Sequence, residues 1–214
     1  KPMIQISTDE VFGSLQTGTA DENSRFNPSS PYAATKAAAE LLINSYCITF
    51  KSKAIITRCT NNFGPRQFAE KLIPKTIILA SKNKKIPIYG TGSNIRDWMY
   101  VDDHCEAIHS VMLNGKYGES YNISSDNELD NITIVKKILE LMDKSEDLIE
   151  FVEDRPGHDF RYSMSSEKIS TELKWNTKTK FDEGLENTIK WYLDNTDIWK
   201  DISTDTLNST PWKN

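Results

Sequence analysis

Tyr32 and Lys36 stand four residues apart at the start of a segment with the composition of a helix. Side chains at this spacing lie on one helical face. An ammonium beside a phenol stabilises the phenolate, so we expect Lys36 to lower the pKa of Tyr32 from its reference value of about 10. Such a tyrosine would be a base usable near neutral pH. Because the chain holds eight tyrosines, the pair is also compatible with an exposed helix surface that does no chemistry.

A hydroxyl and two carboxylates follow a short β-prone run, at Thr8, Asp9 and Glu10. Neighbouring carboxylates in a desolvated site push their pKa values apart, so that one can act as an acid and the other as a base. The alternative is a solvated turn in which the aspartate serves as a cap. The pattern therefore predicts an acid–base pair on condition that the turn is shielded from water.

Two cations fall in segments expected to be loops, Arg96 and Arg155. A guanidinium can hold a diphosphate through two parallel hydrogen bonds. The alternative for each is an ordinary surface arginine. His104 and His109 share one expected helix and could simply pack there.

The three cysteines, Cys47, Cys59 and Cys105, are isolated from one another. No Cys-x-x-Cys or Cys/His ligand spacing occurs, so we expect buried free thiols in a reducing compartment and no metal site.

Composition indicates a globular protein, with 37% hydrophobic and 27% charged residues among 214. The longest apolar runs, such as residues 41–43, are far too short for a membrane span, and residues 1–7 have the pattern of a strand rather than a signal peptide. We therefore expect a cytoplasmic protein without a membrane partner. A net charge of -5 argues against non-specific nucleic-acid binding but leaves room for an anionic small molecule.

Strand-like and helix-like segments alternate along the chain. We expect strands at residues 1–7, 54–59, 86–89, 97–101 and 121–123, and helices near 31–50, 70–83, 102–113, 132–142, 166–173 and 182–195. Ser29 or Ser30 should cap the first helix and Asp102 the third, while residues 61–65 should form a loop. The alternation predicts an α/β fold with a parallel sheet, which binds ligands at the carboxyl ends of its strands. Residues 7–10 and 59–62 lie at such ends.

Taken in order, several motifs resemble those of the extended short-chain dehydrogenases/reductases, and in particular the dTDP-glucose 4,6-dehydratases of the NAD-dependent epimerase/dehydratase family. The resemblance covers about residues 2–195. Its motifs are STDEVFG at 7–13, PYAATK at 31–36, NNFGP at 61–65, EKLIP at 70–74, PIYG at 87–90, RDW at 96–98, YNI at 121–123 and RPGHD at 155–159. Phe12 and Phe63 stand where the family often has tyrosine.

The resemblance implies the C-terminal part of a doubly wound, Rossmann-type parallel sheet plus a smaller α/β substrate-binding domain. Residues 1–66 would be the remaining part of the NAD-binding domain, and 67–214 mainly the sugar-nucleotide-binding domain, with about 96–116 returning to the first. The family's Gly-rich fingerprint, which cradles the NAD pyrophosphate, is absent. We therefore expect a preceding half of roughly a hundred or more residues, and this chain by itself to be inactive.

The activity implied by the resemblance is conversion of dTDP-glucose to dTDP-4-keto-6-deoxyglucose with tightly bound NAD. Its implied catalytic residues are Thr8, Asp9, Glu10, Tyr32 and Lys36. Tyr32 and Lys36 would also contact NAD, together with Cys59 and Asn61. The implied substrate-binding residues are Asn62, Lys71, Arg96, Asn122, Arg155 and His158. The family also implies a homodimer formed through a helix bundle to which the Tyr32 helix contributes.

Two other functions stay open. A nucleotide-sugar 4-epimerase shares the Tyr-x-x-x-Lys pair and NAD, but needs neither an acid for C6 nor a base for C5, so Asp9 and Glu10 discriminate between the two. A non-catalytic sugar-nucleotide-binding fragment is the second alternative. These motifs leave open which nucleotide the substrate carries, dTDP, UDP or GDP.

Overall fold

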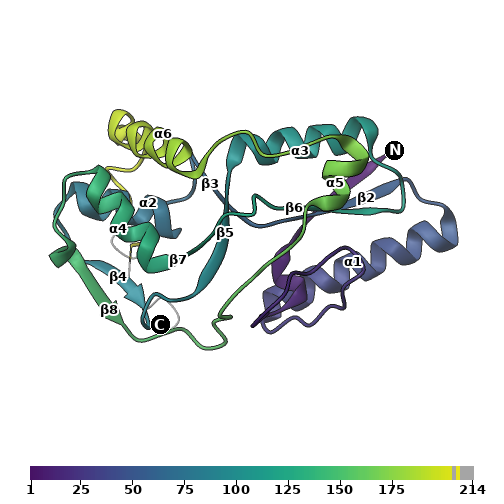
Figure 1. Cartoon of the computed structure of the whole chain (residues 1–214), viewed down its shortest axis with the longest axis horizontal. Coiled ribbons are helices and arrows are strands. Elements are labelled where there is room, and N and C mark those ends of the chain that lie inside the picture. Colours follow the sequence, from purple (N-terminus) through teal and green to yellow (C-terminus); the bar gives the residue numbers. More distant parts are fainter. Residues whose placement is uncertain (204–205, 208–214) are drawn as a thin grey trace. The chain divides into compact units, whose positions relative to one another are not determined.

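The computed structural model describes residues 1–203 and 206–207, and in it the chain forms two compact units (Figure 1). The first contains Lys1–Asn62, Arg96–Glu128 and Asp159–Thr179; the second contains Phe63–Ile95, Leu129–His158 and the residues from Lys180 on. The chain passes between them five times, and three of these crossings fall within strands. These strands are β3 (Asn61–Phe63), β5 (Ile95–Tyr100) and β7 (Glu128–Asp130), which form a sheet in the order β3-β5-β7.

These boundaries bear on the expected domains without assigning their roles. Residues 96–116 were expected to return to the first domain. In the structure two stretches return to the first unit, Arg96–Glu128 and Asp159–Thr179. That one unit binds NAD and the other the sugar nucleotide stays a prediction.

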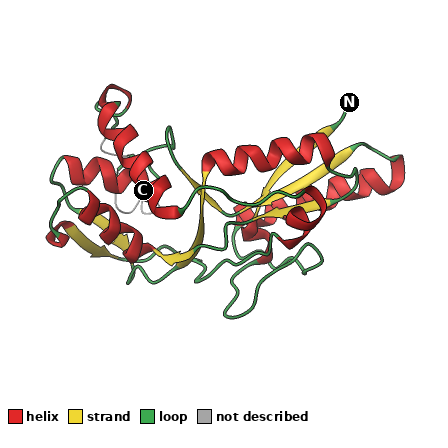
Figure 2. Cartoon of the chain, turned by 45° about the horizontal axis from the view of Figure 1, so that its top comes forward, coloured by secondary structure: helices red, strands yellow, loops and turns green. Residues whose placement is uncertain are grey.

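A parallel sheet in the order β1-β2-β6 forms the centre of the first unit, from β1 (Met3–Thr8), β2 (Ala54–Cys59) and β6 (Ser120–Ile123). Figure 2 shows these strands in yellow with helices beside them. In its register, Thr8 pairs with Cys59 and Cys59 with Ile123. The strands therefore end together, and the predicted α/β fold with a parallel sheet is confirmed.

The helices of the first unit are α1 (Pro31–Phe50), α3 (Val101–Asn114) and α5 (Glu167–Leu173). The start of α1 is as predicted, because Ser30 accepts a hydrogen bond from the Ala33 amide and Pro31 occupies the first turn. Such a cap satisfies an amide that the helix cannot. The predicted cap of α3 is wrong: Tyr100 is the cap residue, and Asp102 lies in the first turn, where a carboxylate interacts favourably with the helix dipole.

A short 3₁₀ turn, η1 (Asp9–Phe12), follows β1 directly. The Thr8 side chain caps it by accepting from the Glu10 amide, and Gly13 ends it at a φ of 71°. A Cβ on Gly13 would lie 2.1 Å from the Asn27 carbonyl oxygen, so this position requires glycine. The turn places Asp9 and Phe12 in the interior rather than in solvent.

The second unit contains α2 (Leu72–Ser81), α4 (Asn131–Leu141), α6 (Phe181–Asp194) and a parallel pair, β4 (Ile86–Tyr89) with β8 (Ile149–Val152). Two short turns, η2 (Glu146–Leu148) and η3 (Thr196–Ile198), complete it. Its apolar core is formed by Leu79, Ala80, Ile86, Ile88, Val135 and Leu139. Helix α2 is shorter at both ends than predicted.

Three strands escaped prediction from the sequence: β3, expected as a loop, β7 and β8. Each has only three or four residues, which is too short for a period-2 pattern to be read, and each depends on pairing with a distant segment.

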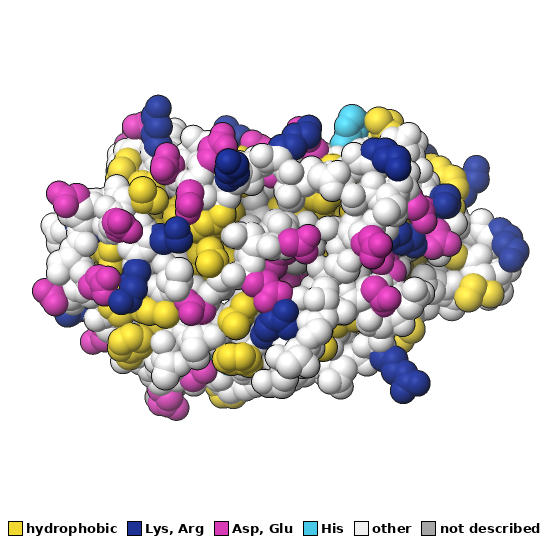
Figure 3. All heavy atoms as spheres, viewed as in Figure 1, with side chains coloured by type: hydrophobic (Ala, Val, Ile, Leu, Met, Phe, Trp, Pro, Cys, Tyr) yellow, Lys and Arg dark blue, Asp and Glu magenta, His cyan; other side chains and the backbone are white. Residues whose placement is uncertain are grey.

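The surface fits the mild acidity of the sequence. On the face of the molecule in Figure 3, acidic and basic side chains are interspersed. No helix in the described part of the chain is long and apolar enough to cross a membrane. The cysteines are free, as expected, but they are less buried than expected: Cys47 and Cys59 are half-buried and Cys105 is exposed.

Candidate active site

Asp9 is a buried carboxyl group at the sheet edge. It is 4% exposed, and its Oδ1 accepts a hydrogen bond of 3.1 Å from the Thr8 hydroxyl. Burial, followed by the neighbouring Glu10 charge, raises the pKa of Asp9 to about 7. Since the ionised form is disfavoured there, Asp9 can hold a proton near neutral pH and give it up, which is the behaviour of a general acid.

The same shift predicts how stability depends on pH. The pKa of Asp9 is higher in the folded chain, about 7, than the ordinary value of 3.8, so the folded state binds this proton more tightly. That contribution to stability is complete below about pH 4 and is lost as the pH rises through about 7. Asp9→Asn should remove the dependence, raising the free energy of unfolding by up to about 4 kcal/mol near pH 8 with no gain near pH 4. Thermal melts of the parent and of Asp9→Asn between about pH 4 and pH 8 measure this difference in stability. If the stabilities of the two proteins change in parallel with pH, the raised pKa of Asp9 is contradicted.

Tyr32 and Lys36 share one face of α1, as expected, but they do not interact as predicted. Lys36 Nζ donates to the Ile6 carbonyl at 2.6 Å. The pKa of Tyr32 is raised, first by burial and then by the charge of Glu10, while a hydrogen bond with Thr8 opposes the shift. The prediction that Lys36 lowers this pKa is therefore wrong for this structure, because acidic neighbours and partial burial dominate.

The end of β2 adds further polar groups to the same edge. The Cys59 thiol lies 3.6 Å from the Ser7 carbonyl, and burial, then the Asp9 charge, raises its pKa to about 12. Cys59 is thus a neutral thiol rather than a nucleophile. Asn61 is exposed, and half-buried Asn62 places its Nδ2 3.4 Å from the Thr60 carbonyl.

Two hydroxyls at this edge were missed from the sequence. Ser7 Oγ and Thr60 Oγ1 are buried, and within the described residues neither has a hydrogen-bond partner. Buried hydroxyls without partners are costly unless a ligand or water satisfies them. Their position at adjacent strand ends was the available signal.

Arg96 is buried and holds a distant loop segment. Its two terminal nitrogens donate to the carbonyls of Asp159, at 2.9 Å, and Phe160, at 3.1 Å. The guanidinium lies 4.3 Å from the centre of the Tyr162 ring, and its charge acts on Asp9. Arg96 is therefore close to the carboxylates, and its predicted contact with the substrate diphosphate would add to these bonds.

A cluster around Asp159 was also missed. The Asp159 carboxylate accepts from the Ser29 hydroxyl and, at 2.7 Å, from the Tyr162 hydroxyl. Burial, then this bond to Asp159, then the Glu10 charge raise the pKa of Tyr162. Tyr162 therefore stays protonated close to Glu10. Its position three residues after the RPGHD motif is the only hint in the sequence.

Asn122 is fully buried, and its Oδ1 accepts from Arg58 at 3.1 Å. Within the described residues its Nδ2 has no partner, so this nitrogen is the part of the side chain that a substrate could use.

The remaining predicted ligands belong to the second unit. Lys71 is exposed and pairs with Glu70 at 2.9 Å. His158 Nδ1 lies 2.7 Å from Asp154 Oδ1, and its ring meets the Tyr89 ring edge-on with centroids 6.5 Å apart.

Electrostatics link Arg155 to the same part of this unit. Burial raises the pKa of Tyr89, while the Arg155 charge lowers it.

Lys75 lies on α2, one turn after the cap residue Lys71. It is buried, and burial lowers its pKa. Lys75 was not predicted, because a lysine inside an apolar helical run is normally solvated. No group of metal-binding side chains occurs in the part of the chain that the structure describes.

Comparison with known proteins identifies the family. The protein-family model described as GDP-mannose 4,6 dehydratase matches residues 1–188. The chain is 46% identical over 208 residues to a probable dTDP-glucose 4,6-dehydratase of Sinorhizobium fredii, covering 94% of this chain and 59% of that protein. It matches the solved dTDP-glucose 4,6-dehydratase of Bacillus anthracis in complex with NAD with a TM-score of 0.92 and 44% identity, over 94% of this chain and 65% of that one.

A UDP-glucuronic acid 4-epimerase of Bacillus cereus, solved with UDP-glucuronic acid and NAD, is less similar: its TM-score is 0.85 and its identity 27%, over 89% of this chain and 61% of that one. The chain spans less than two thirds of the length of each of these relatives. It belongs to the nucleotide-sugar 4,6-dehydratase family of short-chain dehydrogenases/reductases, and within that family it is similar to dTDP-glucose 4,6-dehydratases.

Proposed function

We propose that the protein to which this chain belongs converts dTDP-glucose to dTDP-4-keto-6-deoxyglucose with loss of water. The observation that carries the proposal is the buried Asp9 beside Glu10, with a pKa of about 7. An acid and a base on adjacent residues suit the elimination of water across two neighbouring carbons. The similarity to dTDP-glucose 4,6-dehydratases supports the same activity.

Each residue has a role in this reaction. Tyr32 would take the proton from the sugar 4-hydroxyl, and Thr8, whose side chain acts to lower the pKa of Tyr32, would contact the same oxygen. Glu10 would remove the C5 proton, which the 4-ketone has made acidic. Asp9 would protonate the departing C6 hydroxyl, which leaves as water. When bound, NAD+ would supply the hydride acceptor at C4 and the hydride donor at C6, and a proton would return to C5, so that NAD+ is regenerated.

The sheet edge fits a polar cofactor. The buried hydroxyls of Ser7 and Thr60 need a hydrogen-bond partner, and the Cys59 thiol beside them donates weakly to the Ser7 carbonyl. Tyr32, Lys36, Cys59 and Asn61 would hold the nicotinamide end of NAD.

The candidate substrate ligands of the first unit are Asn62, Arg96 and Asn122, and those of the second unit are Lys71, Arg155 and His158. The cations among these candidates, Lys71, Arg96 and Arg155, suit a diphosphate. As expected from the sequence, we propose that the protein is a homodimer located in the cytoplasm.

The epimerase alternative is less well supported. Epimerisation at C4 needs removal and return of one hydride at C4 and of one proton at O4, the latter by Tyr32, so it leaves Asp9 and Glu10 without a task. Maintaining a buried carboxyl group with a raised pKa costs stability, and a protein gains nothing from it without a matching step.

Mass spectrometry of the product tests the proposal. The full-length protein is incubated with NAD+ and dTDP-glucose. Parallel reactions contain UDP-glucose or GDP-mannose as alternative nucleotide-sugar substrates. We expect a product lighter by one water from dTDP-glucose, formed faster than from the other two. A product of unchanged mass whose C4 configuration is inverted, as judged by the NMR coupling constants of the sugar ring, would instead identify an epimerase. Binding without turnover of any of the three would identify a non-catalytic binding protein.

A further inference from the structure

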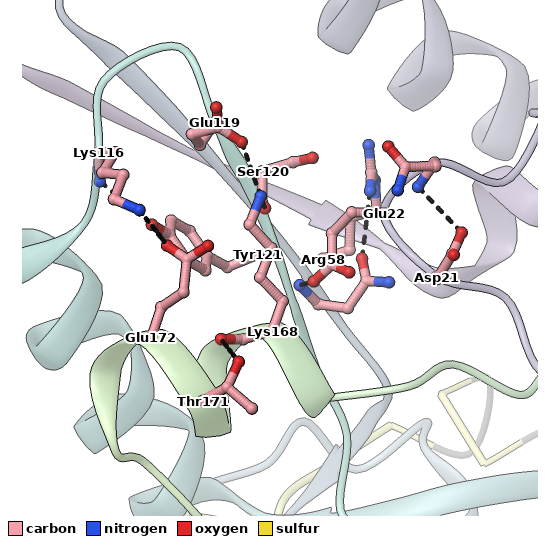
Figure 4. Close-up of polar contacts among 12 residues, drawn as sticks. Asp21, Glu22, Arg58, Lys116, Glu119, Ser120, Tyr121, Lys168, Thr171 and Glu172 are labelled. Carbon is pink, nitrogen blue, oxygen red and sulfur yellow. Dashed lines mark hydrogen bonds and ion pairs between the residues drawn. The ribbon is translucent and has the colours of Figure 1, made fainter.

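Arg58, in the middle of the first unit, carries a charge that the proposed reaction does not use. It is 2% exposed, and its Nε and Nη2 both donate to the fully buried Glu40, at 3.0 and 2.7 Å. Its Nη1 donates to Asn122 Oδ1 at 3.1 Å. Figure 4 labels Arg58 and, on the neighbouring strand β6, Ser120 and Tyr121, the two residues that precede Asn122. The guanidinium carbon lies 5.1 Å from the centre of the Phe12 ring and 5.3 Å from that of Phe26. These two rings are neighbours, with centroids 6.1 Å apart, so the cation contacts an aromatic pair while its nitrogens bind Glu40 and Asn122.

Stability alone does not account for this arrangement. Moving two opposite charges out of water costs about as much as their attraction returns, and well-packed apolar residues of similar volume are often at least as stabilising. A buried ion pair is better explained by the geometry that it enforces, because its hydrogen bonds have fixed directions and a guanidinium forms a rigid, planar fork.

The contacts of Arg58 join the elements that carry the candidate acid and bases. Glu40 lies four residues after Lys36 and eight after Tyr32, so the three share one face of α1. Phe12 is the last residue of η1, the turn that carries Asp9 and Glu10. One guanidinium thus contacts α1 through Glu40, η1 through Phe12 and β6 through Asn122.

We propose that Arg58 and Glu40 are positioning residues that hold the Tyr32 face of α1 at a fixed distance from the Asp9–Glu10 turn. This inference rests on the proposed dehydration, in which a single bound sugar must meet Tyr32 at O4 and Glu10 at C5. The two groups sit on different elements, and the Arg58 fork is the shared anchor between them. Misplacement by about 1 Å is enough to cost about 100-fold in rate.

The test replaces the ion pair by apolar residues of similar volume, Arg58→Met with Glu40→Leu, in the full-length protein. We expect a melting temperature close to that of the parent and a kcat for dehydration lower by about 10–100-fold, because alignment affects the transition state more than binding. KM should rise by a smaller factor than kcat falls, since Asn122, a candidate substrate ligand, loses its bond to Arg58. Amide hydrogen exchange over residues 9–13 should accelerate about tenfold or more as η1 loosens. This second measurement does not depend on the substrate.

Ile55→Ala is the matched control. Ile55 lies on the same strand as Arg58, and its core cluster includes no residue of α1 or η1. It should lower the melting temperature and leave kcat and the exchange of residues 9–13 unchanged. If the double variant does not fold, Arg58→Lys replaces it, keeping the charge but losing the fork and its planar face, and the same losses are expected.

The outcomes separate the two proposals. A folded variant with the parent kcat and parent exchange overturns the positioning role, and so does a control variant that loses rate as much as the ion-pair variant. If the parent does not dehydrate dTDP-glucose, the proposed function fails by itself. The exchange of residues 9–13 then still decides whether Arg58 and Glu40 hold η1 in place.

Discussion

Glu10→Gln in the full-length protein is expected to halt the reaction after the first hydride transfer. The amide keeps the shape of the side chain but cannot accept the C5 proton. NADH and a 4-ketoglucose nucleotide should still form, whereas elimination should slow about 10²–10⁴-fold, the usual scale for loss of a general base. Incorporation of solvent deuterium at C5 should fall in parallel. Reactions quenched in deuterated water and analysed by mass spectrometry measure both quantities.

Asp9→Asn is the matched comparison, since it alters the neighbouring carboxyl group by the same chemical change. Exchange at C5 should persist because Glu10 is intact, while cleavage of the C6–O bond slows. In the parent, the elimination step should also slow as the pH rises through about 7, where Asp9 loses its proton, and Asp9→Asn should abolish this dependence. If both variants dehydrate at the parent rate, Asp9 and Glu10 are not the acid and base, and the pair is a structural turn.

Tyr32→Phe should slow oxidation at C4 by about 10²-fold or more, because it removes the base for the 4-hydroxyl and keeps the ring. Transient NADH absorbance after mixing with substrate reports this step. The pKa of Tyr32 is raised, mainly by burial, so the phenolate fraction grows with pH above neutrality. The rate of C4 oxidation in the parent should therefore rise with pH over this range, and Tyr32→Phe should remove the rise.

Tyr46→Phe provides the control on the same helix. Tyr46 is exposed and packs against Phe50, so its hydroxyl should not affect oxidation. Parent-like NADH transients in Tyr32→Phe, or an equal loss in Tyr46→Phe, would refute Tyr32 as the base.

Local patterns in the sequence were enough for the main elements. The cap at Ser30 with Pro31 behind it defined the start of α1, and the apolar run of β2 identified a buried strand. These features depend on neighbouring residues, which the sequence contains directly. The order of the motifs indicated the family, because several weak patterns in one order are jointly specific.

Contacts between distant residues decided the rest. Arg58 meets Glu40 across 18 positions, and Ser29 meets Asp159 across 130, and no spacing rule brings such pairs together. The sequence predicted that Asp9 and Glu10 would differ in pKa, but it left open that Asp9 is the buried member whose pKa rises. It predicted the wrong direction for Tyr32, because a lysine four residues away was visible while the burial and the acidic turn beside Tyr32 were not. A pKa depends on solvent exclusion and on charges within a few ångströms, and both are set only when η1, α1 and β2 pack together.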